Sequence, residues 1–242
     1  MLAIETRNLS KKYKEKYAVK SLNLTVNQGE LYSLLGVNGA GKSTTIKMLS
    51  CLVPPTEGDA ILNGHSILNN SQEVKKIISV SPQETAVAEK LSVRENLEFI
   101  AQIYGFDRKT AKQKAEDIIE KFDLREFAKQ KSKTLSGGLM RRLSIAMALI
   151  TEPEILFLDE PTLGLDVLAR RELWSVISKL KGKITIILTT HYLEEAESLS
   201  DRIGIMAKGN LKAEGTAYEL KTIAKTDNFE DAFVKICDGG AL

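Results

Sequence analysis

Several features that mark particular classes of protein are scarce in this sequence. Its 242 residues include two cysteines and one tryptophan, and 34 basic residues nearly balance 32 acidic ones, which gives a formal net charge of +2. Cys51 and Cys237 are far apart and fit no metal or disulfide spacing. The near balance of charge gives no electrostatic reason to bind nucleic acid, so we expect no nucleic-acid partner.

Long apolar runs are also missing. No stretch of about 18 apolar residues occurs, so no segment is predicted to span a membrane. The first charge comes as early as Glu5, which is unlike a signal peptide. We therefore expect a soluble protein of a reducing compartment, in which any function at a membrane depends on a partner that supplies the span.

A glycine-rich stretch in the first fifth of the chain carries the most specific pattern. Residues 32–35 are mostly apolar, as in a buried strand, and residues 44–49 are compatible with a helix. The residues between them fit G-x-x-x-x-G-K-[ST], the pattern of a phosphate-binding loop. An ordinary glycine-rich turn would match the letters but would not need the strand before and the helix after. The residues predicted to bind phosphate are Gly36, Asn38, Gly39, Ala40, Gly41, Lys42, Ser43 and Thr44.

The residue types of this loop explain its chemistry. Glycines let the backbone curl so that its N–H groups point inward, where a side chain would block a phosphate. The helix N-terminus adds partial positive charge and unpaired N–H donors. Lys42 can place its ammonium on the outer phosphates, and Ser43 can offer its hydroxyl to Mg²⁺, which prefers oxygen ligands. This stretch therefore predicts a nucleoside triphosphate site.

Polar side chains directly follow three other predicted strands, and α/β sheets bind ligands at such strand ends. Two adjacent carboxylates at the end of a buried strand are costly unless a cation lies nearby. We expect Asp159 to bind Mg²⁺ directly or through its waters, and Glu160 to polarise the water that attacks a γ-phosphate. Taken alone, the other two residues could be a surface glutamine and a structural histidine. The set is Gln83 after residues 77–80, Asp159 and Glu160 after residues 155–158, and His191 after residues 184–188.

The regions around these strands differ in pattern. Residues 1–30 alternate like β-structure, and Tyr13 lies in a loop among them, where it could stack on a purine or be an edge-strand tyrosine with a hydrated hydroxyl. Residues 167–181 predict a helix with Trp174 on its apolar face, as part of the core. Residues 203–213 predict a hairpin, and two short helices are expected after it.

Residues 84–150 change to helical periodicity and predict an inserted helical lobe. A capping box at Ser92 opens the first of its helices. Ser136 can cap a later helix, and Gly137 and Gly138 leave backbone N–H groups open to a visiting anion. An ordinary capped helix start is an equally good interpretation of that stretch.

Taken together, these motifs resemble the nucleotide-binding subunit of ABC transporters, in the family's order and over almost the whole chain. The match includes the signature at residues 135–138 and an aspartate loop at Asp166. Leu139 stands where the signature usually has Gln, a change that could weaken a dimer or alter its coupling, while the Ser and Gly donors are intact. Residues 190–197 are similar to the subfamily that serves ABC-2-type exporters.

The resemblance implies an α/β fold: a P-loop NTPase core with a mostly parallel sheet, an N-terminal antiparallel β subdomain and an inserted helical subdomain. It implies a single ABC ATPase domain over residues 1–242. In that division residues 1–83 and 151–242 form the nucleotide-binding core with the β subdomain. Residues 84–150 form the helical subdomain, which includes the signature.

The resemblance also implies a set of site residues for ATP and Mg²⁺. Tyr13 would stack on adenine, with Tyr17 as the competing candidate. Ser136, Gly137 and Gly138 would bind ATP across a dimer, at the γ-phosphate held by the other subunit, so neither site is complete in a monomer. The implied catalytic residues are Glu160, His191, Gln83 and Lys42, and the implied metal-binding residues are Ser43, Gln83 and Asp159.

The implied function is an ATP-binding and ATP-hydrolysing subunit that powers a separate membrane permease, of the ABC-2 exporter type. Its implied partners are a second copy or a closely related ATPase subunit, arranged head to tail, and integral membrane permease subunits. Its implied location is cytoplasmic, at the inner face of the cell membrane. A soluble ABC ATPase acting on ribosomes or nucleic acid, or a nucleotide-binding regulator without turnover, are the alternatives. One compact cassette and near-neutral charge favour the transporter.

Overall fold

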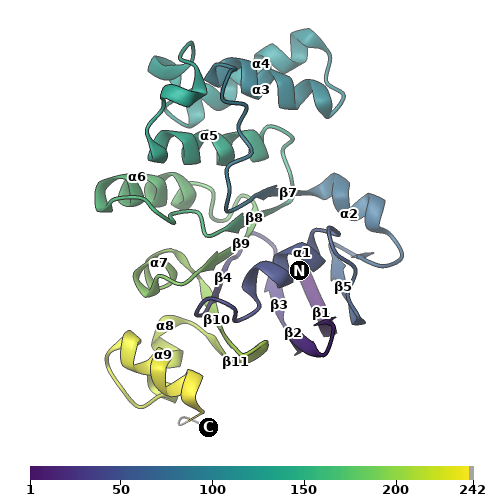
Figure 1. The fold of residues 1–242 in the computed structure, drawn as a ribbon, viewed down its shortest axis with the longest axis vertical. Coiled ribbons are helices and arrows are strands. Elements are labelled where there is room, and N and C mark those ends of the chain that lie inside the picture. Colours follow the sequence, from purple (N-terminus) through teal and green to yellow (C-terminus); the bar gives the residue numbers. More distant parts are fainter. Residues whose placement is uncertain (240–242) are drawn as a thin grey trace.

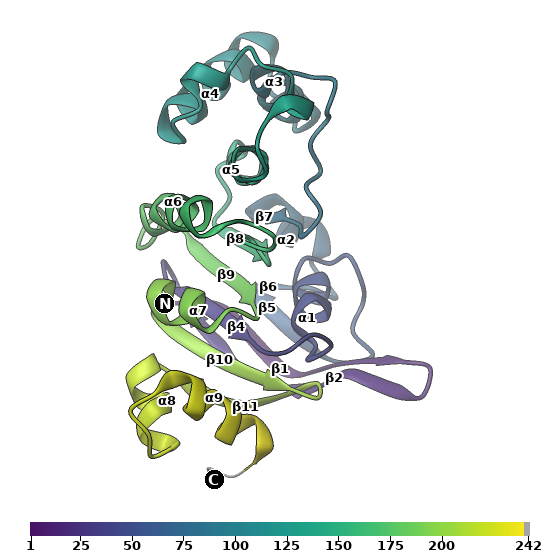
Figure 2. The same ribbon diagram turned by 60° about the vertical axis from the view of Figure 1, so that its left-hand side comes forward.

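Two sheets of different kinds enclose the helix that follows the phosphate loop. The structure is a computed structural model, and it describes residues 1–239. Helix α1 (Lys42–Leu49) lies between a mostly parallel sheet and an antiparallel sheet built from the N-terminal region (Figures 1 and 2). This arrangement confirms the predicted fold class.

The larger sheet has six strands in the order β11-β10-β4-β9-β8-β7. Strands β10, β4, β9, β8 and β7 are parallel to their neighbours, and β11 is an antiparallel edge. The sheet is parallel because helices connect its strands, and every residue of the three central strands is buried. The strands are β4 (Leu31–Leu35), β7 (Ile78–Ser81), β8 (Ile155–Asp159), β9 (Thr185–Thr190), β10 (Arg202–Ala207) and β11 (Asn210–Gly215).

The smaller sheet has five antiparallel strands, and its long first strand pairs with three of the others. Asn63 and Gly64 both have positive φ and form the tight turn between its last two strands. Tyr13 is the last residue of the first strand, so the alternative of a strand tyrosine is correct and the loop position is wrong. The strands are β1 (Leu2–Tyr13), β2 (Lys16–Leu22), β3 (Thr25–Asn27), β5 (Glu57–Leu62) and β6 (His65–Ser66).

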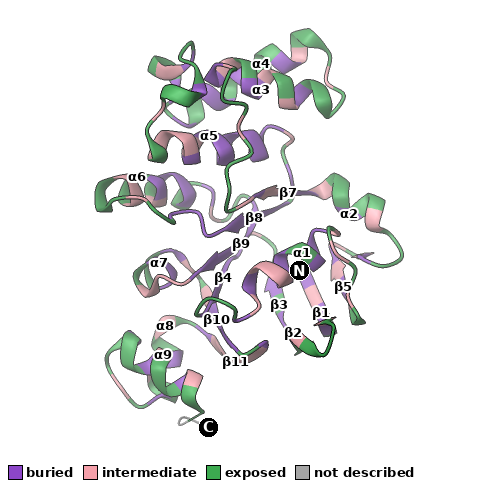
Figure 3. Cartoon of the chain, viewed as in Figure 1, coloured by how far each residue is buried: buried purple, intermediate pink, exposed green. Residues whose placement is uncertain are grey.

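Successive side chains of the central strands point to opposite faces of the sheet, so the core is divided into two layers. Ile155 and Phe157 of β8 pack with α1 and the antiparallel sheet, whereas Leu156 and Leu158 pack with helices on the opposite face. The strand is continuously apolar because both of its faces are covered, as the burial colours of Figure 3 show. These two layers fix the polar end of β8 at the sheet edge.

Helices from residues 84–150 cover the far face and extend from it (Figure 1). They share one apolar cluster with β8 and β9, without a break between the helices and the sheet. The predicted capping box is present: the Glu95 backbone N–H donates to Ser92 Oγ at 3.2 Å, and the Ser92 N–H donates to Glu95 Oε2 at 2.7 Å. The elements are α3 (Val93–Ile103), α4 (Arg108–Lys121), 3₁₀ turns at Arg125–Phe127 and Ser132–Thr134, and α5 (Gly137–Leu149).

The remaining helices include two that we did not predict. These are α2 (Ser71–Ile77), before β7, and α7 (Leu193–Leu199), after β9. Both are only seven residues long, which leaves little helical periodicity to detect. The other three are α6 (Val167–Ser178), α8 (Ala217–Ile223) and α9 (Phe229–Asp238).

Two details of α6 differ from the sequence prediction. The helix ends at Ser178, three residues before the expected Lys181. Trp174 packs against the core cluster as predicted, but it is only half-buried, and its Nε1–H donates to Glu195 Oε1 at 3.0 Å. An indole that reaches a carboxylate keeps its polar edge satisfied, which apolar periodicity alone does not reveal.

Within residues 1–239, no helix is both long enough and apolar enough to cross a membrane.

Candidate functional site

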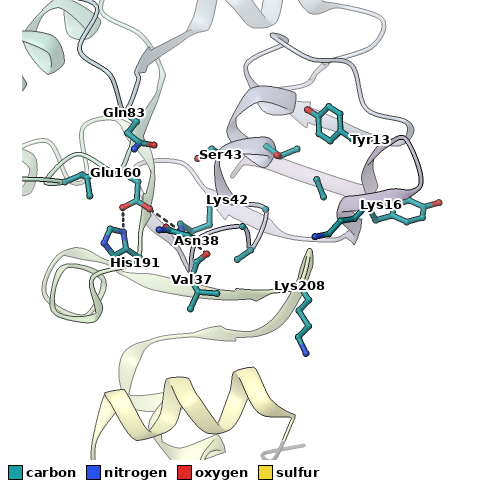
Figure 4. A pocket seen from close by; sticks show the side chains of 17 residues that line it. Tyr13, Lys16, Val37, Asn38, Lys42, Ser43, Gln83, Glu160, His191 and Lys208 are labelled. Atoms are coloured by element: carbon teal, nitrogen blue, oxygen red, sulfur yellow. Dashed lines mark hydrogen bonds and ion pairs between the residues drawn. The ribbon is translucent and has the colours of Figure 1, made fainter.

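A cavity of about 740 Å³ lies at the C-terminal edge of the parallel sheet, between the phosphate loop and the β1–β2 hairpin (Figure 4). The structure brings most of the predicted site residues to its wall, from segments at both ends of the chain. Those that line the cavity are Tyr13, Asn38, Gly39, Ala40, Gly41, Lys42, Ser43, Thr44, Gln83, Glu160 and His191.

The loop between β4 and α1 needs glycine where other backbone segments come close. A Cβ on Gly36 would overlap the carbonyl oxygen of Met206. Gly41 has a φ of 110°, and a Cβ there would lie 2.5 Å from the Ala18 carbonyl oxygen. Both positions hold the loop against β10 and β2, so its backbone N–H groups can face the cavity.

Lys42 is buried at the centre of this loop, with 5% of its surface exposed. Its Nζ donates to the Gly36 carbonyl oxygen at 2.6 Å and lies 3.2 Å from Glu160 Oε1. A buried ammonium is tolerated here because a carbonyl and a carboxylate both pair with it. The same ammonium can turn to an anionic ligand without leaving the loop.

A set of oxygens at the end of β8 fits a magnesium ion. Ser43 Oγ donates to Asp159 Oδ1 at 3.0 Å, and Thr189 Oγ1 donates to the same carboxylate oxygen. Among the described residues there is no group of three or more His, Cys, Asp or Glu that could hold a metal by itself. Mg²⁺ commonly binds through one or two protein oxygens together with substrate phosphates, so this donor set fits it.

Glu160 occupies the central place among the polar residues of the cavity. It is 6% exposed, its Oε1 pairs with Lys42, and its Oε2 lies 2.8 Å from His191 Nδ1. An ionised carboxylate only accepts, so His191 Nδ1 carries the proton and leaves Nε2 for another partner. The Glu160 backbone has a φ of 48°, unusual for a residue other than glycine, and its N–H donates to Thr189. The turn therefore aims this carboxylate into the cavity.

Two tyrosines, Tyr13 and Tyr17, line the cavity beside the β1–β2 hairpin. Tyr13 is 47% exposed, and Tyr17 is held by a hydrogen bond from its hydroxyl to Glu57 Oε1 at 3.1 Å. Either ring could stack on a base.

Some predicted residues lie outside the cavity. Gly36 and Asp159 sit behind its wall, where Gly36 accepts from Lys42 and Asp159 accepts from Ser43. Ser136 and Gly137 are exposed at the start of α5, and the Ser136 hydroxyl accepts from the Leu139 N–H at 3.3 Å. The signature residues are therefore separate from this chain's own nucleotide cavity.

Leu139 is explained by its surroundings. It is half-buried and packs against the apolar cluster of α3, α4 and α5, where a leucine side chain fits and an amide would need partners.

Sequence reasoning missed several residues at the site. Lys16 and Lys208 line the cavity from two hairpins, and nothing in their local sequence indicates this position. Thr189, which donates to Asp159, did have a signal, because it directly follows the predicted strand of residues 184–188, two residues before His191.

The fold and the site together define a P-loop nucleoside triphosphatase: a glycine loop between strand β4 and helix α1, its buried lysine, and paired carboxylates at the end of β8, which β9 separates from β4. A family model described as "ABC transporter" matches residues 19–163. The chain belongs to the ABC transporter family, as an ATP-binding and ATP-hydrolysing subunit that powers a separate membrane permease.

Individual relatives agree with this assignment. The chain is 41% identical over 229 residues to the daunorubicin resistance ATP-binding protein DrrA3 of Streptomyces coeruleorubidus, covering 94% of this chain and 72% of that protein. It is 41% identical to the linearmycin resistance ATP-binding protein LnrL of Bacillus subtilis, covering 90% of this chain and 70% of that protein.

A solved structure supports the fold and the chemistry. It is the dimeric, post-hydrolysis state of the ATP-binding cassette MJ0796 bound to ADP and Pi. The TM-score is 0.78 at 28% identity, covering 88% of this chain and 98% of that chain.

Proposed function

We propose that this chain is the ATPase subunit of an exporter, and that it works as a head-to-tail pair with a second copy or a close relative. The names of the two relatives, each a resistance protein for an antibiotic, support export as the direction. In this proposal the permease crosses the membrane and the chain acts at its cytoplasmic face. The observation that carries the catalytic part is the Glu160 carboxylate, held between Lys42 and His191 at the wall of the nucleotide cavity.

Each residue at the cavity has a role that its position supports. Lys42 and the loop N–H groups bind the phosphates, and Tyr13 or Tyr17 stacks on the base. Ser43 and Asp159 hold Mg²⁺, with Gln83 near it. Bound Mg²⁺ would neutralise charge on the outer phosphates.

Hydrolysis in this proposal depends on Glu160 and His191. Glu160 accepts a proton from the attacking water, which needs a carboxylate within hydrogen-bond reach of that water. His191 keeps Glu160 oriented through Nδ1, and it can also donate from Nε2 to the γ-phosphate when the imidazole carries a proton on both nitrogens. Lys42 releases Glu160 Oε1 when phosphate takes its place beside the ammonium.

The second subunit would complete the site. Ser136, Gly137 and Gly138 begin α5 outside this chain's cavity, and the first two are exposed. Unpaired N–H groups at the start of a helix of 13 residues suit a phosphate brought by another chain. We therefore propose that this end of α5 binds the ATP held in the partner's phosphate loop.

The helical segment, residues 84–150, is the part that we propose meets the permease. Three large side chains of this segment are about half exposed on or just after α3: Phe99 at 50%, Ile103 at 59% and Tyr104 at 56%. An apolar surface of this kind suits a helix from a membrane protein. The division into this segment and a nucleotide-binding core of residues 1–83 and 151–242 is part of the proposal.

The test is to recover the partner. A tagged Glu160→Gln variant, with ATP to hold the closed pair, would be isolated from detergent-solubilised membranes, alongside the same variant without nucleotide. We expect a polytopic membrane protein in the ATP sample, and we expect that protein, reconstituted with the wild-type chain in vesicles, to change the ATPase rate. Recovery of ribosomes or nucleic acid without a membrane protein would contradict the exporter proposal.

A further inference from the structure

Arg141 is the one buried arginine of α5, the helix that begins with the signature residues, and none of the roles proposed above involves it. It lies in the second turn of α5 and is 5% exposed. Its side chain leaves the helix toward the ends of β7 and β8, the strands that lead to Gln83 and Glu160. A cation this deeply buried is costly, so its contacts should explain why it is there.

The guanidinium binds the backbone of two separate turns. Nε donates to the Pro161 carbonyl oxygen at 2.8 Å, and Nη2 donates to the Asp159 carbonyl oxygen at 2.6 Å. Nη1 donates to the Gln83 carbonyl oxygen at 3.2 Å and also to that of Pro82. One side chain therefore ties the segment after β7 to the turn that contains Glu160.

These contacts depend on the shape of the guanidinium as much as on its charge. Among residues 1–239, Arg141 forms no ion pair within 4 Å, although burial lowers its pKa to about 10 and the carboxylates of Asp159, Glu195 and Glu160 oppose that shift. It is therefore charged at neutral pH, and its charge is balanced at a distance. A lysine would bring the charge but not the planar fork that reaches both turns at once.

The next residue gives a direct contrast. Arg142 lies on the same helix, but its Nη2 pairs with Glu172 Oε2 at 2.9 Å, and that glutamate side chain is 67% exposed on α6. The Arg142 side chain itself is 13% exposed, so only the glutamate end of this pair is open to solvent. Arg142 touches neither turn, so it is a matched control for Arg141.

We propose that Arg141 is a positioning residue for ATP hydrolysis: it fixes the Gln83 segment and the Asp159–Pro161 turn relative to each other. Gln83, Asp159 and Glu160 then face one nucleotide in a single arrangement. The inference rests on the roles proposed for those three residues. Arg141 itself does not line the cavity, and it acts only through their backbone.

The binding of the nucleotide base and of the outer phosphates should not depend on this tie. The phosphate loop and the β1–β2 hairpin make no hydrogen bond with Arg141. Loss of Arg141 should therefore lower turnover much more than ATP affinity. A misplacement of about 1 Å in a catalytic group costs roughly 10²-fold in rate, which sets the scale of the effect.

The test compares Arg141→Lys, Arg141→Met and the control Arg142→Met in the full-length chain. For each we would measure kcat and KM for ATP, the Mg²⁺ concentration that gives half-maximal rate, equilibrium ATP binding and the melting temperature. We expect kcat to fall about 10- to 10²-fold for both Arg141 variants, with ATP affinity within about threefold of wild type and a higher Mg²⁺ requirement. Arg142→Met should keep the kcat and ATP affinity of wild type even where the melting temperature falls, because Arg142 makes no hydrogen bond with either turn.

Two results would overturn the proposal. One is a kcat within about twofold of wild type in a folded Arg141 variant. The other is an equal fall of kcat and ATP affinity that follows the loss of folded protein, because Arg141 would then only stabilise the fold. If Arg141→Met does not fold, Arg141→Lys decides, since it retains the charge. Glu160→Gln is assayed in parallel: if it hydrolyses ATP like wild type, the roles assigned to the site fail independently of Arg141.

Discussion

Replacement of Glu160 by glutamine should change the structure very little and should lower the rate of ATP hydrolysis strongly. The two side chains have the same shape, and both oxygens of Glu160 have partners: Oε1 with Lys42 Nζ at 3.2 Å and Oε2 with His191 Nδ1 at 2.8 Å. Glutamine can keep both contacts, with its oxygen toward Lys42 and its NH₂ donating to His191 Nδ1, once the imidazole proton has moved from Nδ1 to Nε2. What it cannot do is accept a proton from water at neutral pH.

The size of the effect follows from that loss. General-base catalysis contributes about 10²- to 10⁴-fold, or roughly 3–5 kcal/mol in the activation free energy. The variant also leaves the Lys42 ammonium with the Gly36 carbonyl and without its carboxylate, which costs about 1–3 kcal/mol in the free energy of unfolding. For a chain of this length, that is a melting temperature lower by roughly 2–12 °C. The protein should therefore remain folded while turnover falls by about 10²-fold or more.

The assay combines steady-state phosphate release, ATP binding and sedimentation with and without ATP. We expect ATP binding to survive and the ATP-bound variant to sediment as a dimer, since the closed pair is no longer opened by hydrolysis. Glu154→Gln is the matched control, because Glu154 is an exposed carboxylate just before the same strand, with its side chain on Asn63. A Glu160→Gln protein that hydrolyses ATP as fast as this control would remove Glu160 as the base.

Two further predictions concern binding and pH. Tyr13→Ala should weaken ATP binding by about 1–3 kcal/mol, the value of one base stacking on an aromatic ring, and Tyr17→Ala should weaken it much less. Titration of each variant with ATP measures both effects. If Tyr17→Ala has the larger effect, the base stacks on Tyr17. Burial raises the pKa of Glu195, and the hydrogen bond from Trp174 opposes that shift. The folded state therefore binds the Glu195 proton more tightly than the unfolded state does. This contribution to stability is fully present below the ordinary glutamate pKa and is lost as pH rises through the raised pKa of the folded state. Glu195→Gln should remove that loss, with a melting temperature above that of wild type at pH 8 and little different at pH 4.5; an equal difference at both pH values would refute the assignment.

The parts of the fold that could be predicted are those with a local cause. The strand, glycine loop and helix around Lys42 are adjacent in sequence, and the capping boxes at Ser92 and Thr216 are both present because each needs only four consecutive residues. The polar residues after β7, β8 and β9 meet at one edge because parallel strands end on the same side of a sheet. Spacing along the chain was enough to find them.

The parts that could not be predicted depend on contacts between distant segments. We made no prediction for Arg141 from the sequence, and only the packing of α5 against β7 and β8 shows that its side chain is 5% exposed and binds the backbone of two turns. Trp174 fitted the apolar stripe of its helix, but only the fold shows that its Nε1–H donates to Glu195, a buried carboxylate from α7. A buried charged residue has no local signature, because its partners are backbone atoms that any sequence can supply.

The position of Arg141 also bears on how two nucleotide sites in a pair would affect each other. Its helix begins with Ser136 and Gly137, exposed and free to bind a phosphate held by another chain, and one turn later Arg141 holds this chain's own Asp159–Pro161 turn. A helix is stiff over this distance, so a displacement of its first turn is carried to the guanidinium. Binding of the partner's ATP at Ser136 would then shift the carboxylate that acts on this chain's ATP. Under both proposals, the two nucleotide sites of the pair are coupled through α5. In each chain, Arg141 is the residue that transmits a displacement of α5 to the Asp159–Pro161 turn.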